Sequence, residues 1–156
     1  MIDKFGGHAM AAGLSLAERQ FKPFARAASE QLLRLYPQAD FSGAIVTDGE
    51  LAATALSLTV ARTLREAGPW GAGFPEPLWQ GDFEVLEQRT VGDRHLKLRL
   101  RPRGGADAID AIAFNQAGPV FRGSVRLAYR LEINEWRGVE TPQLVVEQIT
   151  GLEAAC

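Results

Sequence analysis

The stretch SVRLAYRLEIN, residues 124–134, decides the fold class because apolar side chains occupy every second position. The apolar set is Val125, Leu127, Tyr129, Leu131 and Ile133, and arginine, glutamate and other small or polar side chains stand between them. A period of two places the apolar set on one face of an extended chain. The stretch therefore predicts a β-strand with one buried face.

The same period extends to both sides of this strand. Four further strands are expected at Phe83–Thr90, His95–Pro102, Ala108–Phe114 and Gln143–Ile149. Five short strands separated by turns, with no substantial helix among them, predict a small barrel.

Upstream of residue 83 the pattern is mixed. Apolar residues at spacings of three and four predict helices over about Arg19–Tyr36 and about Ala53–Ala67. Small apolar runs at Met10–Leu16 and Ala44–Val46 predict short strands, the first leaving a glycine-rich turn. The segment Gly68–Pro77 carries three glycines and three prolines, which indicates a stiff connector.

Composition favours a packed fold in a reducing compartment. Of the 156 residues, 46% are apolar and 23% are charged, which argues against disorder. The single cysteine, Cys156, is the last residue and cannot form a disulfide within the chain. No apolar run approaches the roughly 20 residues that a bilayer span requires. We therefore expect a cytoplasmic protein with no membrane partner.

The net charge of −2 is unfavourable for a nucleic-acid-binding protein, but the charges are unevenly placed. Between residues 89 and 103 the only acid is Asp93. The same stretch holds six basic residues: Arg89, Arg94, Lys97, Arg99, Arg101 and Arg103. The local excess of positive charge is therefore the more informative quantity.

A glycine-rich segment, GGHAMAAG, occupies residues 6–13. Consecutive glycines at Gly6 and Gly7 allow a ligand to approach the backbone closely, and His8 can donate to a phosphate oxygen. From the residues alone, a tight turn with a structurally bonded histidine is the more common interpretation.

Five separate segments, in the same order, resemble the C-terminal portion of the RecJ family of bacterial single-strand-specific DNA exonucleases. GGHxxAAG is the signature of the DHHA1 domain, which accompanies the DHH domain in a family of phosphoesterases. The segments are KFGGHAMAAGLSL, AGPWGAGFPEP, RHLKLRL, AFN and LAYRLEINEWRG. Phe74 departs from the family, which often has asparagine there.

The resemblance implies an α+β, mainly β architecture: a five-stranded OB-fold barrel preceded by helices and a DHHA1 remnant. It implies domains at residues 1–38 (C-terminal part of DHHA1), 39–151 (RecJ-type OB domain) and 152–156 (tail). It also implies that the parent degrades single-stranded DNA from the 5′ end in recombination and repair. Gly6, Gly7 and His8 match positions that line the nucleotide site, with the histidine near a DNA phosphate.

The family hydrolyses DNA with two divalent metals, usually manganese or else magnesium, held by aspartates and histidines of the DHH domain. This chain has only His8 and His95, no DHH triplet, and no clustered ligand spacing. We expect neither a metal nor another cofactor in this part, and we expect that it does not cut DNA alone.

The second candidate site is the row Lys97, Arg99 and Arg101, which alternates with leucines. In a small barrel the leucines belong to the core, so the basic row faces outward on the second strand, where OB folds bind oligonucleotides. Arg94 precedes this strand. The alternative is an ordinary solvated charged face.

Trp136 and Arg137 stand in the turn expected between the last two strands, where an exposed tryptophan could stack on a base. Trp70 and Trp79 flank the connector and are expected to be packing residues. A second function remains open: a protein-interaction module that docks the single-strand-binding protein, whose acidic tail would suit a basic strand. An RNA-directed function is disfavoured, because the short oligoribonucleases of the superfamily generally lack this barrel.

Overall fold

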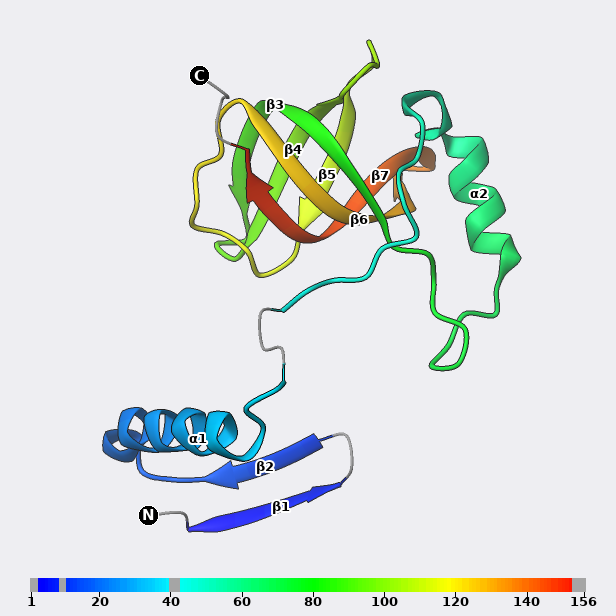
Figure 1. Ribbon diagram of the computed structural model, residues 1–156. Helices are drawn as coiled ribbons and strands as arrows, with labels where there is room; N and C mark the ends of the chain where they lie inside the picture. Colours follow the sequence, from blue (N-terminus) through cyan, green and yellow to red (C-terminus); the bar gives the residue numbers. More distant parts are fainter. Residues whose placement is uncertain (1–2, 9–10, 40–42, 153–156) are drawn as a thin grey trace. The chain divides into compact units, whose positions relative to one another are not determined.

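The computed structural model describes residues 3–8, 11–39 and 43–152, and the chain divides into two units, Met1–Ala44 and Ile45–Cys156 (Figure 1). Ala9 and Met10 of the glycine-rich segment, most of the expected tail, and Cys156 lie outside the described residues.

The first unit is a hairpin followed by a helix. Strands β1 (Lys4–His8) and β2 (Ala11–Ser15) pair antiparallel, and a short helix, η1 (Glu18–Gln20), leads into α1 (Phe21–Leu35). Pro23 lies in the first turn of α1, where its missing N–H costs little. The predicted helix and the strand after the glycine-rich segment are both confirmed.

Gly6, Gly7 and His8 belong to strand β1, and the expectation of a glycine-rich turn at these residues is wrong. Gly6 pairs with Gly13, Gly7 with Ala12 and His8 with Ala11. A Cβ on Gly7 would lie 3.0 Å from the backbone oxygen of Ala11. Glycine at this position therefore allows close approach between two strands.

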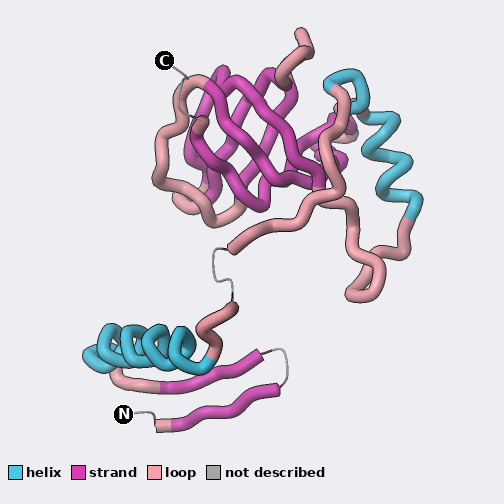
Figure 2. The backbone as a smooth tube through the Cα atoms, in the orientation of Figure 1, coloured by secondary structure: helices cyan, strands magenta, loops and turns pink. Residues whose placement is uncertain are grey.

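The second unit is built on five strands that close into a ring (Figures 1 and 2). Its strands are β3 (Trp79–Val91), β4 (His95–Pro102), β5 (Ile109–Ala113), β6 (Ser124–Trp136) and β7 (Val139–Gly151). The order around the ring is β3-β4-β5-β7-β6, with β6 pairing back onto β3. All pairs are antiparallel except β5 with β7. The five predicted strands and the closed sheet are confirmed.

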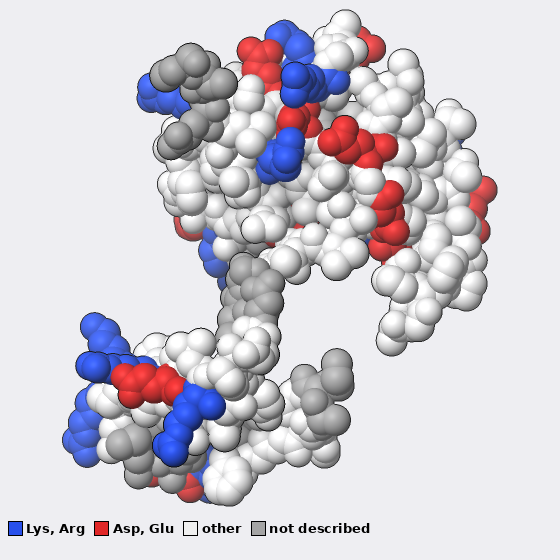
Figure 3. Space-filling view, in the orientation of Figure 1, with Lys and Arg blue, Asp and Glu red and all other residues white. Residues whose placement is uncertain are grey.

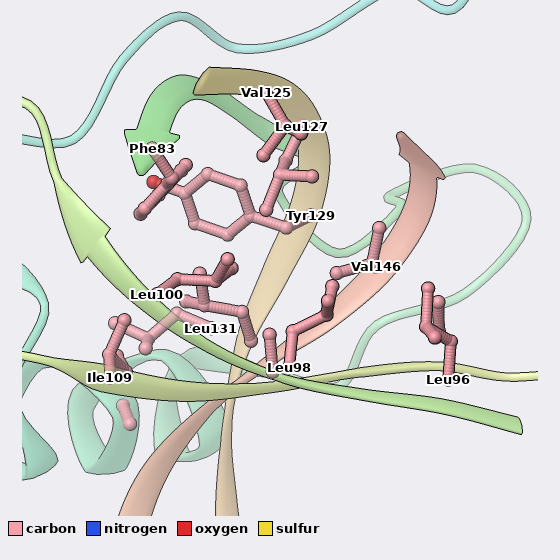
Figure 4. Close-up of a cluster of buried hydrophobic side chains, with 14 residues drawn as sticks. Phe83, Leu96, Leu98, Leu100, Ile109, Val125, Leu127, Tyr129, Leu131 and Val146 are labelled. Atoms are coloured by element: carbon pink, nitrogen blue, oxygen red, sulfur yellow. The ribbon is translucent and has the colours of Figure 1, made fainter. Parts of the chain in front are cut away.

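The interior of the ring is filled by the apolar side chains that the period of two places inward (Figure 4). Leu96, Leu98 and Leu100 of β4 are at most 1% exposed. The rings of Phe83 and Tyr129 meet edge to face, with centroids 5.5 Å apart. Burial raises the pKa of Tyr129 to about 12. The edge-to-face contact of Phe83 and Tyr129 stabilises the fold beyond the effect of burying apolar area.

Helix α2 (Leu58–Ala67) packs against β6 and β7, with Ala61 buried. The predicted continuous helix over residues 53–67 is wrong in its first part, where a separate short helix, η2 (Ala53–Ala55), precedes α2. Ser57 separates the two, because its hydroxyl accepts a hydrogen bond from the Val60 N–H and caps α2.

The strand predicted at Ala44–Val46 is also wrong, since these residues are not paired with any strand of the described structure. Pairing begins slightly later. Glu50 bridges Gln80, whose N–H donates to the oxygen of Gly49, and the N–H of Asp48 donates to Leu78. The chain therefore joins the sheet at residues 48–50, after the apolar run.

Two tryptophans anchor the connector. Trp70 donates from Nε1 to the Leu64 oxygen at 3.1 Å and stacks on Phe74, with centroids 4.9 Å apart. Trp79 packs against the core cluster. The expected packing role of both residues is confirmed. Among the described helices, none combines the length and apolarity that crossing a membrane requires.

Candidate nucleic-acid interface

The basic row of β4, defined as Lys97, Arg99 and Arg101, lies on the outside of the closed sheet. The three leucines between these residues point inward and are buried. Arg99 and Arg101 are exposed, and Lys97 is partly exposed. The predicted division of β4 into an apolar inner face and a basic outer face is confirmed.

Acidic side chains from the two neighbouring strands contact this row. Asp110 of β5 lies 3.1 Å from Lys97 Nζ and 3.0 Å from an Arg99 nitrogen. Glu84 of β3 lies 2.7 Å from an Arg101 nitrogen. Three cations therefore share two carboxylates. A count of charges along residues 89–103 misses these acids, because strand pairing brings them in from elsewhere.

The same mixture of charges is visible on the face of the molecule shown in Figure 3, where basic and acidic side chains lie next to one another on the second unit. The basic side chains on that face are interleaved with acidic ones and do not form a continuous patch. At the row itself, Asp110 and Glu84 contact all three cations, so attraction for phosphate depends on the local arrangement of donors rather than on a broad positive field.

One end of the row carries two further arginines. Arg89 pairs in register with Lys97 across β3 and β4, and Arg94 lies in the turn between those strands. Both are exposed, and within the described residues neither forms an ion pair. Arg89 was not a predicted site residue, because its position beside Lys97 depends on the register between two strands.

The surface along the row is hollowed. A pocket of about 270 Å³ is lined in part by Arg89, Lys97 and Arg99. A second pocket, of about 570 Å³, is lined in part by Ser57, Arg99 and Thr141. Arg99 and Asp110 line both pockets, so the two hollows adjoin at this ion pair. Together they define the β4 groove.

The turn between β6 and β7 presents Trp136 and Arg137. Trp136 is 69% exposed, and the guanidinium carbon of Arg137 lies 5.7 Å from the centre of its ring. Arg137 and Gly138 have φ values of 52° and 77°, as a tight two-residue hairpin turn requires. The expected exposure of Trp136 is confirmed.

Strand pairing places the two turns at opposite ends of β4. Arg94 directly precedes β4, beside its first residue. Residues 143–145 of β7 run parallel to residues 110–112 of β5, and the start of β5 pairs with the end of β4. Trp136 and Arg137 therefore lie toward the C-terminal end of β4.

In the first unit, Gly6, Gly7 and His8 are all exposed on β1. Their predicted contact with phosphate stays a prediction.

The described residues contain no group of three or more histidine, cysteine, aspartate or glutamate side chains that could hold a metal ion. The charged side chains around the row pair as cation and carboxylate instead. The candidate site so defined offers charge-assisted hydrogen-bond donors and an exposed aromatic ring.

Comparisons with known proteins identify the family of the chain. The model of the RecJ OB domain family matches residues 47–148. The chain is 46% identical over 153 residues to the single-stranded-DNA-specific exonuclease RecJ of Salmonella typhimurium, covering 96% of this chain and 26% of that protein. The corresponding protein of Escherichia coli is 45% identical, with the same coverage. The chain thus spans about a quarter of the length of these relatives.

A solved structure has a similar fold. The crystal structure of RecJ from Thermus thermophilus in complex with Mg²⁺ matches with a TM-score of 0.62 and 27% identity, covering 98% of this chain and 24% of that one. A second structure, of the complex with Mn²⁺, matches with the same TM-score. The chain therefore belongs to the RecJ family, and residues 47–148 are its OB domain.

Proposed function

We propose that this chain supplies part of the DNA-binding surface of a RecJ-like exonuclease, which degrades single-stranded DNA from the 5′ end in recombination and repair. The basic row carries the proposal: it faces outward on the second strand of an OB domain, the surface on which such domains bind oligonucleotides. The relatives named as single-stranded-DNA-specific exonucleases support this substrate class.

Binding requires phosphate to compete with Asp110 and Glu84 for the row. Exposed ion pairs contribute only about 0–1 kcal/mol each, so exchange of a carboxylate for a phosphate costs little. The hydrogen bonds seen for Arg99 and Arg101 engage one terminal nitrogen of each guanidinium. The other donors of each side chain can then contact a phosphate oxygen. Binding through these contacts is weak and salt-dependent.

Arg94, Trp136 and Arg137 extend the surface at the two ends of the row. Arg94 offers a further phosphate contact, and Trp136 offers a ring on which one base can stack, with Arg137 beside it. Stacking tolerates every base, because each base has a π face. The proposed surface therefore binds single strands without strong sequence preference.

The first unit has a separate role in this proposal. Residues 1–38 form the C-terminal part of a DHHA1 domain, 39–151 the OB domain and 152–156 a tail. Gly6, Gly7 and His8 then contact a phosphate near the scissile bond. In the intact parent enzyme, His8→Ala should lower the cleavage rate about 100-fold, as expected for loss of a donor to the reacting group, and leave the melting temperature unchanged. Normal turnover, or a lower melting temperature, would contradict this role.

The metal site of the parent belongs, in this proposal, to a DHH domain outside this chain. The two solved relatives are complexes with Mg²⁺ and Mn²⁺, whereas the described residues here offer no cluster of ligands for such an ion. The chain alone should release no nucleotides above a mock preparation when Mn²⁺ or Mg²⁺ is supplied. The protein is expected to act in the cytoplasm.

Fluorescence anisotropy of the 156-residue chain with a labelled oligonucleotide of about 12 nucleotides tests the proposal. About three phosphate contacts give a log–log salt slope near −2, so affinity should fall roughly 20-fold between about 50 and 200 mM salt. Duplex DNA of the same length serves as the comparison. Absence of salt-dependent binding would overturn the proposal.

The alternative function is a docking module for the single-strand-binding protein. Such a module would bind a labelled acidic peptide and show no affinity for bare oligonucleotide. This outcome would replace the DNA-binding proposal, because both partners would use the same basic row.

A further inference from the structure

The outer face of β5 continues beyond the strand to an exposed aromatic ring. Ile109, Ala111 and Ala113 point inward and are at most 6% exposed. Asp110 and Ile112 alternate with them on the outer side. Phe114 follows in the same outward series and is 50% exposed. The sequence alone places Phe114 at the end of a strand but does not show that it shares a face with the basic row.

Strand pairing puts Phe114 beside the charged end of the β4 groove. Asp110 pairs with Arg99 and Ile112 pairs with Lys97. Leu96 pairs with Ala113, so the next step along the same ladder brings His95 to Phe114. The ring thus extends the row of outward side chains toward Arg94, the residue before His95.

The ring of Phe114 is held in place. His95 meets it edge to face, with centroids 5.3 Å apart and an interplanar angle of 79°. The backbone N–H of Asn115 donates to His95 Nδ1 at 3.1 Å, which fixes the imidazole. Asn115 has a φ of 57°, a left-handed conformation that asparagine adopts readily, and it turns the chain away directly after Phe114. Phe114 is therefore half exposed while its ring is positioned by contact with His95.

We propose that Phe114 is a base-stacking residue beside the β4 groove, which takes one base of a single strand while Lys97 and Arg99 contact the neighbouring phosphates. An aromatic ring interleaved with cations is the arrangement that binds single-stranded nucleic acid without sequence preference. With Trp136 at the opposite end of β4, the groove then has a stacking platform at each end. This inference rests on the DNA-binding function proposed above.

The test compares two oligonucleotides of the same length, about 12 residues: one of thymidines, and one with abasic sites at every position. Both carry the same phosphates. Anisotropy is measured for the 156-residue chain and for Phe114→Leu, which keeps an apolar side chain and removes the π face. Phe114→Trp is the rescue variant, because it restores a π face at the same position.

Phe114→Leu should weaken binding of the thymidine oligonucleotide roughly 5- to 150-fold, the range expected for one stacked base. Binding of the abasic oligonucleotide and the salt slope should not change, since no phosphate contact is lost. Phe114→Trp should bind the thymidine oligonucleotide at least as tightly as the unaltered chain.

Equal loss of affinity for both oligonucleotides, or unchanged affinity for both, would overturn the stacking role while leaving the DNA-binding function in place. The stacking role would also be overturned if Phe114→Trp bound the thymidine oligonucleotide as weakly as Phe114→Leu does. If the unaltered chain binds neither oligonucleotide, the proposed function itself is wrong, and this inference falls with it.

Discussion

The two units of the chain differ in what their apolar side chains contact. In the first unit no described helix or strand residue is buried, and Phe21, Leu33 and Leu35 of α1 are 59–62% exposed. In the second unit the strands close on themselves around a core of at least a dozen buried side chains. Both units contain regular secondary structure, and their apolar residues recur with the period expected for it. Among the described residues, only the second unit buries its own apolar side chains. Such burial is the main source of folding stability.

Hydrogen exchange on the whole chain should show the largest difference between the units. Amides of β4, β6 and β7 should exchange slower than those of α1 by roughly a thousandfold or more, because their opening requires global unfolding, about 5 kcal/mol or more. Mass spectrometry of the exchanged chain measures both regions in one sample. Equal protection of α1 and β4 would show that the first unit is stable by itself.

Core truncation sharpens the same comparison. Leu98→Ala removes a buried side chain of β4 and should lower the free energy of unfolding by about 2–5 kcal/mol, through lost burial and the cavity left behind. Leu33→Ala on exposed α1 is the matched control and should change it by less than about 0.5 kcal/mol. Urea denaturation followed by far-ultraviolet circular dichroism, which reports α1 as well as the strands, measures both. Similar losses for the two variants would contradict the assigned difference in packing.

A smaller effect concerns an ion pair on the surface of the second unit. Arg126 donates to both oxygens of Asp82, at 2.7 and 3.0 Å, and this hydrogen bonding holds the pKa of Asp82 below its usual value of 3.8. Because the folded pKa is lowered, the stabilisation is fully present above about pH 4 and is lost as the pH falls through the folded pKa.

Asp82→Asn should therefore lower the free energy of unfolding at pH 7 by at most about 1 kcal/mol. The difference from the unaltered chain should shrink as the pH is lowered from about 5 toward 2. Urea denaturation at several pH values follows it. A difference that stays constant over this range would show that the carboxylate charge is not the cause.

The sequence allowed a good prediction where the determining pattern is local. The alternation of leucine with lysine and arginine predicted β4 at residues 95–102, its bounds in the structure. The inward and outward faces of β6 follow from the same rule, except at Ala128, which is buried where the pairing with β7 shifts register.

What the sequence could not supply depends on pairing between distant segments. The acids that contact the basic row come from β3 and β5. The charge count along residues 89–103 therefore overestimates the net positive charge around the row. Gly6 and Gly7 were read as a turn because glycine is common there, yet they allow two strands to approach. Phe114 joins the candidate site only through its register with β4.

The most direct test of the proposed function compares two variants of equal charge change, one in each unit. Lys97→Gln, Arg99→Gln and Arg101→Gln remove one lysine and two arginines from β4, and Leu96, Leu98 and Leu100 keep the core intact. The matched control, Lys22→Gln, Arg26→Gln and Arg34→Gln, removes the same residue types from α1. Anisotropy with a labelled single strand is recorded at about 50 and 200 mM salt. The β4 variant should lose measurable binding and salt dependence, while the α1 variant should retain a slope near −2. If the β4 variant binds like the unaltered chain, the basic row is a solvated face and does not contact DNA.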